Sequence, residues 1–310
     1  MIKAFKYRLY PTKQQEQKLF WTLARCRELY NAALSERRDA YDIHVRQHPN
    51  YYDEPTHKQL TKEHAVSYYE QKRDLPEIKS ELREEYQEMY SQVLQDVLLR
   101  LDKAFAAFLR RVKNGEEPGY PRFQGRNRYD SFTYPQAGGF SLTHDSRVCL
   151  SKIGSIKVKL HHPIEGKVKI CTIKYEAGQW FVIFSCEYEQ PEPLPVVESE
   201  IGIDLGVTHF AALSDGTFID NPRHYRQSQK KLEKLQQALS RKKQGSHRRD
   251  KARKLVAKAH RKIRNQRRDF QHKHSTNRSG VPRLLSVGRN ERSFWGVMGV
   301  GYNPSRACTS

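Results

Sequence analysis

The chain has 310 residues, enough for two modest domains, and its 37% hydrophobic content is low but still typical of a globular protein. It contains 56 Lys and Arg against 35 Asp and Glu, and the net charge of +21 favours a polyanionic partner. Nucleic acid is the first candidate, and an anionic membrane surface is the alternative. No apolar run approaches the roughly 18–20 residues that span a bilayer, and no signal-peptide pattern opens the chain. A membrane-spanning or exported protein is therefore not expected.

The five cysteines are odd in number and scattered, without a Cys-x-x-Cys pair. This spacing encodes no structural zinc knuckle and is typical of proteins of the reduced cytosol. Buried and chemically inert side chains are therefore expected at Cys26, Cys149, Cys171, Cys186 and Cys308.

The chain opens with a predicted strand followed by a long helix. Residues 2–10 alternate apolar and basic side chains, as in a half-buried strand. Thr12 and Gln15 have the spacing of a capping box, which predicts a helix start. The basic side chains of the strand, which face either RNA or solvent, are Lys3, Lys6 and Arg8. The apolar positions that mark the helix are Leu19, Leu23, Cys26 and Tyr30.

Helices are predicted up to about residue 115. Residues 37–90 are rich in charge and tyrosine and are expected to form exposed helices. Residues 90–112 form a strongly amphipathic pattern that ends near Asn114-Gly115, a usual helix C-cap. The predicted apolar face holds Val93, Val97, Leu101, Phe105, Phe108 and Leu109.

Residues 132–189 are predicted to be all β. The segments 155–160, 167–175 and 179–188 alternate apolar and polar residues, and the last two flank an Ala177-Gly178 turn. A small barrel or sandwich that also takes in the N-terminal strand is the natural closure. The short stiff linker that follows contains Pro191, Pro193 and Pro195.

The stretch 201–216 begins the last region. An apolar strand ends in Asp204, Gly206 lets the chain turn, and a second apolar strand covers 210–213. Asp215-Gly216 predicts a two-residue hairpin with positive φ at both positions. A lone carboxylate at the open end of a buried strand is costly unless it holds a metal or a proton.

The positive charge is concentrated between residues 221 and 278, where 21 Lys and Arg face three acids. Two helices, over 225–243 and 247–274, are predicted to form an antiparallel hairpin around a break at 244–246. Solvated helices usually interleave acids, so this unbalanced charge indicates a polyanion. The candidate phosphate contacts are Arg241, Lys242, Lys243, Arg248, Arg249, Lys251, Arg253, Lys254 and Arg261.

Two smaller features concern possible sites. A loop that starts at Pro118 mixes basic and aromatic residues, which suits either stacking on unpaired bases or capping of the core. Its candidate residues are Tyr120, Arg122, Phe123 and Arg126. His161-His162 precedes Pro163 without a nearby acidic or cysteine partner, so a metal role is not expected there.

Several motifs together are similar to those of one family. The chain resembles the OrfB/TnpB family of RNA-guided nucleases encoded by insertion sequences, over roughly residues 1–276. The matching motifs are Tyr7-Arg-Leu-Tyr-Pro-Thr, Leu29-Tyr-Asn-Ala-Ala-Leu, Pro121-Arg-Phe-Gln, Ser131-Phe-Thr-Tyr, Ile201-Gly-Ile-Asp-Leu-Gly-Val and Arg267-Arg-Asp-Phe-Gln-His-Lys. Each is weak alone, but the combination in this order is specific.

The resemblance implies a bacterial, nucleoid-associated protein that binds a guide RNA and double-stranded target DNA. It implies an α+β fold in which a β-barrel wedge domain with a helical insertion precedes an RNase-H-like (RuvC) domain. The expected divisions are a first barrel strand (1–12), a helical recognition lobe (13–130), the rest of the barrel (131–190), a proline-rich linker (191–199), a partial RuvC-like domain with the basic hairpin (200–275) and an irregular tail (276–310).

RuvC-like cleavage uses two Mg²⁺ ions held by three acids, of which Asp204 matches the first. The family's second acid ends an apolar strand after the basic hairpin, and its third follows a four-cysteine zinc insertion. Here Thr276-Asn-Arg-Ser-Gly-Val-Pro-Arg replaces that strand, Glu291 follows no apolar strand, and the zinc motif is absent. We therefore expect an incomplete site, little DNA cleavage, and a tail from about residue 275 that is translated out of frame.

The sequence leaves three other functions open. The chain could be an active Mg²⁺-dependent endonuclease whose missing acids come from another arrangement of the tail, or it could bind RNA alone. Gly202-Ile-Asp-Leu-Gly-Val-Thr is also similar to the first phosphate motif of the sugar kinase, actin and chaperone ATPase superfamily. Too few residues follow for that superfamily's second phosphate loop and adenosine motif.

Overall fold

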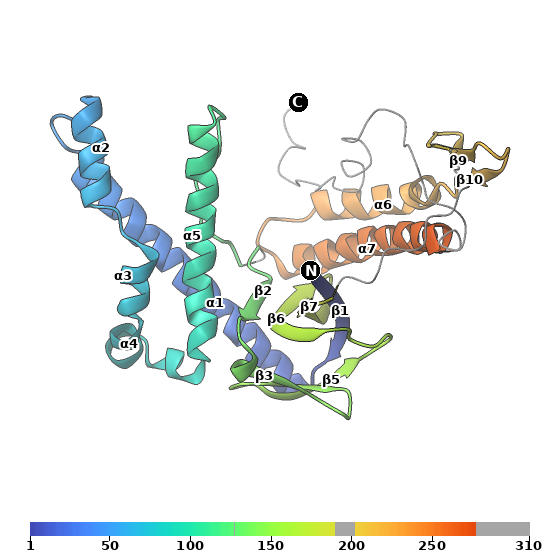
Figure 1. Ribbon diagram of the computed structural model, residues 1–310, viewed down its shortest axis with the longest axis horizontal. Helices are drawn as coiled ribbons and strands as arrows, with labels where there is room; N and C mark the ends of the chain where they lie inside the picture. The colour runs from blue at the N-terminus through green and yellow to red at the C-terminus, as the bar shows by residue number, and fades with distance from the viewer. Residues whose placement is uncertain (127, 190–201, 277–310) are drawn as a thin grey trace. The chain divides into compact units, whose positions relative to one another are not determined.

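The computed structural model describes residues 1–126, 128–189 and 202–276. These residues fall into two compact units, divided at residue 190. Unit 1 combines a seven-stranded antiparallel sheet with helices, and unit 2 combines a three-stranded antiparallel sheet with two long helices (Figure 1). The predicted α+β class is therefore confirmed.

The sheet of unit 1 has the strand order β2-β6-β7-β1-β5-β4-β3. Its N-terminal strand lies inside the sheet, because β1 pairs with β7 from Ile2 opposite Glu187 to Leu9 opposite Trp180, and with β5 on the other side. This confirms the prediction that the first strand joins the sheet of the later strands. The strands are β1 (Ile2–Tyr10), β2 (Ser131–Tyr134), β3 (Phe140–Thr143), β4 (Arg147–Leu150), β5 (Gly154–Lys159), β6 (Lys167–Glu176) and β7 (Gln179–Glu187).

The sheet is curled but not closed by strand pairing, since β2 and β3 are its two edges in the described part of the chain. The curl brings the ends together, and Tyr134 Oη of β2 donates a hydrogen bond of 3.0 Å to the Ser151 carbonyl just after β4. The β6–β7 hairpin turns at Ala177 and Gly178, whose φ values are 49° and 81°. These left-handed values suit the twist of a two-residue hairpin, as the sequence predicts.

Two long helices pack together and against this sheet. Helix α1 (Lys13–Tyr41) starts at the capping box of Thr12 and Gln15, which is formed as predicted. Helix α5 (Ser91–Lys113) contacts α1 and ends at Asn114, followed by Gly115 with φ of 74°. The segments between them are η1 (Asp42–Arg46), α2 (Glu54–Glu63), α3 (Tyr68–Arg73), α4 (Leu75–Glu77), η2 (Ile78–Leu82) and η3 (Glu84–Glu88), and a turn η4 (Ala137–Gly139) follows β2.

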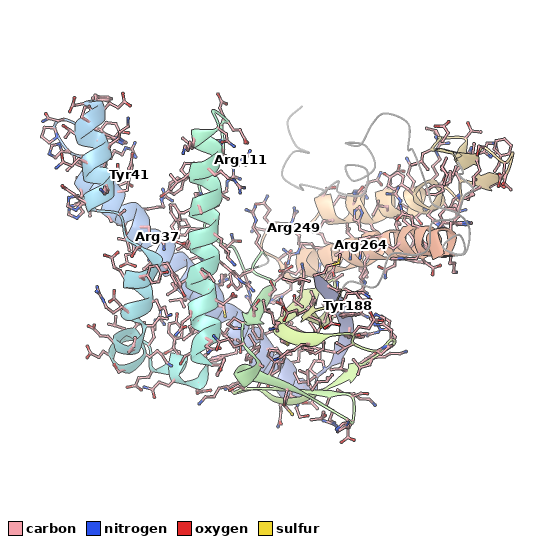
Figure 2. All side chains as sticks on the ribbon, in the orientation of Figure 1. Arg37, Tyr41, Arg111, Tyr188, Arg249 and Arg264 are labelled. Atoms are coloured by element: carbon pink, nitrogen blue, oxygen red, sulfur yellow. The ribbon has the colours of Figure 1, made fainter. Side chains whose placement is uncertain are left out.

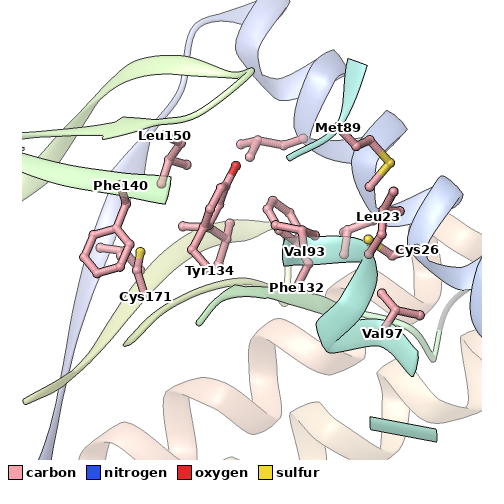
Figure 3. Close-up of a cluster of buried hydrophobic side chains, with 14 of the residues drawn as sticks. Leu23, Cys26, Met89, Val93, Val97, Phe132, Tyr134, Phe140, Leu150 and Cys171 are labelled. Atoms are coloured by element: carbon pink, nitrogen blue, oxygen red, sulfur yellow. The ribbon is translucent and has the colours of Figure 1, made fainter. Parts of the chain in front are cut away.

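The core of unit 1 lies between these helices and the inner face of the sheet, where Val93 and Val97 of α5 face Phe132 of β2 (Figure 3). The predicted apolar face of α5 extends beyond this core, because Leu109 is 60% exposed. The prediction of buried cysteines is confirmed for Cys26, Cys171 and Cys186, whereas Cys149 is half-buried. Burial raises the pKa of Cys26 to about 12, so this thiol stays protonated and unreactive. Cys308 lies outside the described residues.

The described part of unit 2 begins with a small sheet in the order β10-β9-β8. The β9–β10 hairpin is present as predicted, but its turn type differs. Only Gly216, with φ of 82°, has a positive φ, and the Gly216 N–H donates to the Leu213 carbonyl at 3.0 Å. The geometry is a longer loop with glycine at the left-handed position, in which the Asp215 carboxylate accepts from the Thr217 N–H at 2.8 Å. The strands are β8 (Ile203–Asp204), β9 (His209–Leu213) and β10 (Phe218–Asp220).

The predicted helical hairpin is also present in unit 2. Helices α6 (His224–Ser240) and α7 (His247–Thr276) lie side by side in Figure 1. The loop between them contains Gly245 with φ of 79°, and α6 ends three residues earlier than predicted. Across the described ranges, no helix combines the length and the apolar character that crossing a bilayer requires.

Candidate nucleic-acid interface

The loop 118–126 is held against α1 by a single asparagine. Asn31 Nδ2 donates to the Gln124 carbonyl at 3.1 Å, and Asn31 Oδ1 accepts from the Gln124 N–H at 2.8 Å. One side chain therefore satisfies both backbone groups of a loop residue that is 93 positions away in sequence. Two of the motifs on which the family resemblance rests meet at this contact.

Next to this contact, aromatic rings and an arginine form a partly exposed cluster. The ring of Tyr120 packs edge-on against Phe105 and Phe108 of α5, at 5.5 and 5.2 Å between ring centroids. The guanidinium of Arg38 lies 5.9 Å from the Tyr120 ring and 5.3 Å from the Phe123 ring. The residues Tyr120 and Phe123 are 38% and 45% exposed, and burial raises the pKa of Tyr120.

The contacts of this loop bear on the two predicted roles, stacking on bases and capping of the core. Tyr120 packs on the apolar rings of Phe105 and Phe108 and is still partly exposed, and Phe123 is somewhat more exposed. Arg122 and Arg126 are exposed on the same loop. No sequence pattern pointed to Arg38, because this residue lies on α1, far from the loop in the chain. Arg38 could be found only once the contact between Asn31 and Gln124 shows that the loop lies beside α1.

Arg37, the preceding residue on α1, shows how different two adjacent arginines can be. It is buried, and it donates from Nε to Gln71 Oε1 at 3.0 Å and from Nη1 to Asp102 Oδ1 at 3.2 Å (Figure 2). Its charge is therefore used within unit 1, between α1, α3 and α5. Arg38 is the one of the pair that is positioned to meet a ligand.

The basic hairpin of unit 2 places most of its candidate cations on the surface. Arg241, Lys243, Arg248, Lys251 and Lys254 are exposed, and Lys242, Arg249, Arg253 and Arg261 are half-buried. Arg253 forms an ion pair with Asp250 at 3.2 Å, which reduces the charge that it offers to a ligand.

Arg249 has a structural role that the sequence did not indicate. Its guanidinium donates to the Lys242 carbonyl at 2.6 Å and to the Leu239 carbonyl at 3.4 Å (Figure 2). Leu239 lies in the last turn of α6, where backbone acceptors lack helical partners, and Lys242 follows in the loop just after the C-cap Arg241. Arg249 thus caps one helix of the hairpin from the other, although the sequence assigned it to phosphate binding.

A strand ends at Asp204 as predicted, but the prediction that this strand is buried is wrong. Strand β8 has only two residues, of which Ile203 is half-buried and Asp204 is exposed. In register, Asp204 faces Ala212 of β9. The described residues contain no group of three or more His, Cys, Asp or Glu side chains that could hold a metal ion. The donors described around Asp204 therefore do not fit a pair of divalent ions, each of which takes about six or more oxygen ligands. Glu291 lies outside the described residues.

The histidine pair at 161–162 packs on β1. Tyr7 Oη and His162 Nδ1 are 2.9 Å apart, and both histidine rings contact the buried ring of Tyr7. The pair therefore packs against the central strand of the sheet.

Comparison with known proteins gives two family matches. A family of OrfB proteins of IS605-type elements, described as a probable transposase, matches residues 183–277, and its helix-turn-helix domain matches residues 1–44. A protein of Escherichia coli K12 named "Putative RNA-guided DNA endonuclease InsQ" is 31% identical over 277 residues, which are 89% of this chain and 63% of that protein. A Streptomyces pristinaespiralis protein named "Putative RNA-guided DNA endonuclease" is 32% identical over 278 residues, which are 88% of this chain and 63% of that protein.

The chain belongs to the OrfB family of IS605-type transposon proteins. It spans about 63% of the length of these two OrfB relatives. The match named for a helix-turn-helix covers β1 and the single long helix α1, so residues 1–44 of this OrfB chain contain no second helix after a turn. The first strand of that match pairs within the sheet of unit 1.

Proposed function

We propose that this OrfB chain binds a guide RNA and a double-stranded DNA target, and that it does so without cutting the DNA. The observation that carries the proposal is the basic hairpin of unit 2, whose exposed cations greatly outnumber its acids. Both relatives are named as RNA-guided DNA endonucleases, which supports RNA and DNA as the polyanions. In the proposed division, the curled sheet is the wedge domain, the helices of unit 1 are the recognition lobe, and unit 2 is the beginning of a RuvC-like domain.

Each element has a chemical role in this proposal. The exposed cations of α6, α7 and their loop bind phosphates, which position the backbone without reading sequence. Tyr120 and Phe123 offer ring faces and edges on which unpaired bases stack, and Arg38 adds a planar cation beside both rings. Stacking tolerates any base, so this cluster would hold a strand that base pairing has already selected.

The proposal of binding without cleavage rests on the surroundings of Asp204. In a RuvC-type centre, Mg²⁺ activates the attacking water and steadies the leaving oxygen. Asp204 would be one ligand of such an ion, but it is exposed in a short strand, and the described ranges 1–126, 128–189 and 202–276 hold no group of three or more His, Cys, Asp or Glu side chains that could complete the site. A single carboxylate does not fix two divalent ions, so the chain would hold DNA and leave it intact.

Binding can be measured with a structured RNA and with a DNA duplex, each titrated over a range of salt concentrations. We expect the logarithm of the affinity to fall steeply and linearly with the logarithm of the salt concentration, because cations release counterions from phosphates. Neutralising Arg248, Lys251 and Lys254 together should make the slope shallower by about 2 for RNA. An affinity that does not depend on salt would overturn the proposal.

Cleavage is tested with guide-loaded protein, supercoiled plasmid and Mg²⁺. We expect no nicking above background by the wild-type chain or by Asp204→Ala. Nicking by the wild-type chain that disappears in Asp204→Ala would show an active endonuclease and overturn the cleavage part of the proposal. Tight RNA binding without any guide-directed binding to duplex DNA would indicate a purely RNA-binding protein and overturn the DNA part.

A further inference from the structure

The outward face of the unit 1 sheet carries a row of cations across three neighbouring strands. The strand register places Arg8 of β1 opposite Lys159 of β5, and Lys157 of β5 opposite Arg147 of β4. Tyr10 of β1 lies opposite Lys157 on the other side. All five side chains are exposed, and we call them the basic strip.

Alternation along each strand puts the basic strip on one face. Successive side chains of a strand point to opposite faces of the sheet, so the neighbours of the strip should point inward. These neighbours are all buried in the core: Tyr7, Leu9, Val148, Ile156 and Val158. The strip is therefore a feature of the folded sheet, since its members come from three separate stretches of sequence.

The cations of the strip differ from other lysines of the same sheet. Lys3, Lys6 and Lys169 each pair with a glutamate, at 2.7, 2.5 and 2.8 Å. Among the residues that the structure describes, no carboxylate forms an ion pair with Arg8, Arg147, Lys157 or Lys159. The contrast holds within one strand, since Lys3 and Lys6 lie on β1 together with Arg8. Like charges directly opposite each other across a strand pair are unfavourable, so the strip repels itself in the free protein.

The usual reason for lysines on a sheet does not apply to this strip. Exposed lysines often protect an edge strand from pairing with another chain. However, β1 lies between β7 and β5, and β5 lies between β1 and β4, so both are interior strands. An anionic ligand that neutralises the four cations is the simplest compensation for their mutual repulsion.

We propose that the basic strip binds the phosphodiester backbone of nucleic acid, as a second contact surface besides the basic hairpin. The inference rests on the proposed function, and it assigns a surface in unit 1 to the same partners. The Arg8 guanidinium lies 4.7 Å from the Tyr10 ring, so an exposed stacking face accompanies the phosphate contacts. The same phosphate chemistry is present in the RNA and in the DNA duplex, and the experiment separates them.

The test compares two double variants of the full chain that lose the same charge. Arg8→Gln with Lys159→Gln removes two cations of the strip, whereas Lys58→Gln with Lys169→Gln removes two lysines that pair with Glu54 and Glu187. Each variant is titrated with labelled structured RNA and labelled DNA duplex at several salt concentrations. The strip variant should lose about 1.4 from the salt slope for a single-stranded contact, or about 1.8 for a duplex, and bind roughly tenfold more weakly.

The matched control should keep the wild-type slope and affinity, and so should Arg8→Lys with Lys159→Arg, which retains both charges. If the strip variant binds more weakly and with a shallower salt slope to RNA alone, or to the duplex alone, the result supports the proposal and identifies the nucleic acid that the strip binds. Equal salt slopes for the strip variant, the control and the wild type overturn the proposal that the strip binds nucleic acid, and they leave the proposed function intact. A wild-type chain that binds neither probe overturns both. Thermal unfolding of each variant verifies that the sheet is intact.

Discussion

At the scale of single residues, the contacts of a side chain, more than its residue type, decide whether it stabilises the fold or is available to bind a ligand. Arg37 and Arg38 are adjacent on α1, yet one is buried in a hydrogen-bond network and the other lies over exposed rings. Asn31 is a small polar residue in an amphipathic helix, and it holds the loop that carries Tyr120 and Phe123. Replacing it should therefore affect the loop before it affects the helix.

We expect Asn31→Ala to lower the free energy of unfolding of unit 1 by about 1–2 kcal/mol, because the two backbone groups of Gln124 lose their partner. The loop 118–126 should also become more sensitive to limited proteolysis. Urea unfolding and protease digestion measure these effects, with Asn50→Ala in an exposed turn as the control. Equal stability and equal digestion of the two variants would show that the contact contributes nothing.

At the scale of elements, the basic hairpin combines a charge that favours a ligand with contacts that hold two helices together. Arg249 caps α6 from α7, and its neighbour Arg248 is exposed without such a contact. Charge repulsion along both helices opposes their packing, so this capping contact matters more here than in a neutral hairpin.

Two single substitutions should separate these roles. Arg249→Ala should destabilise the hairpin by about 1–2 kcal/mol, because the Leu239 carbonyl at the end of α6 and the Lys242 carbonyl in the loop lose a charged donor. Arg248→Ala should change stability by less than about 0.5 kcal/mol and should weaken nucleic-acid binding instead. Denaturant unfolding followed by circular dichroism, together with RNA titrations, measures both effects. The reverse pattern would contradict the capping role.

At the scale of the whole molecule, the two units differ in how much apolar surface they bury. The main hydrophobic core, from Phe5 to Cys186, lies entirely in unit 1. In the described part of unit 2, the buried apolar side chains are Ala211, Leu213, Leu232, Ala252 and Ile263. Burial of apolar area is the main favourable term in folding, so unit 2 should be the less stable unit.

Unfolding in urea should therefore proceed in two steps, with the helical hairpin first. Trp21 and Trp180 lie in unit 1, so tryptophan fluorescence reports that unit once the third tryptophan is removed with Trp295→Phe. Helical circular dichroism reports both units. We expect the dichroism signal to begin falling at a lower urea concentration than the fluorescence signal changes. Coincident transitions would show one cooperative unit. Nucleic acid should move the first step to higher urea.

The sequence alone determined the elements whose signals are local. Alternation predicted β1, the pairing of Thr12 with Gln15 predicted the start of α1, and Ala177-Gly178 predicted the β6–β7 turn, because periodicity, capping and left-handed φ depend on neighbouring residues. The charge of the hairpin was equally visible. Only the tertiary structure decided which contacts join distant residues. It placed β1 between β7 and β5, brought Asn31 to Gln124, aligned Arg8 with Lys159, and left Asp204 exposed. These depend on strand order and packing, which no local pattern encodes.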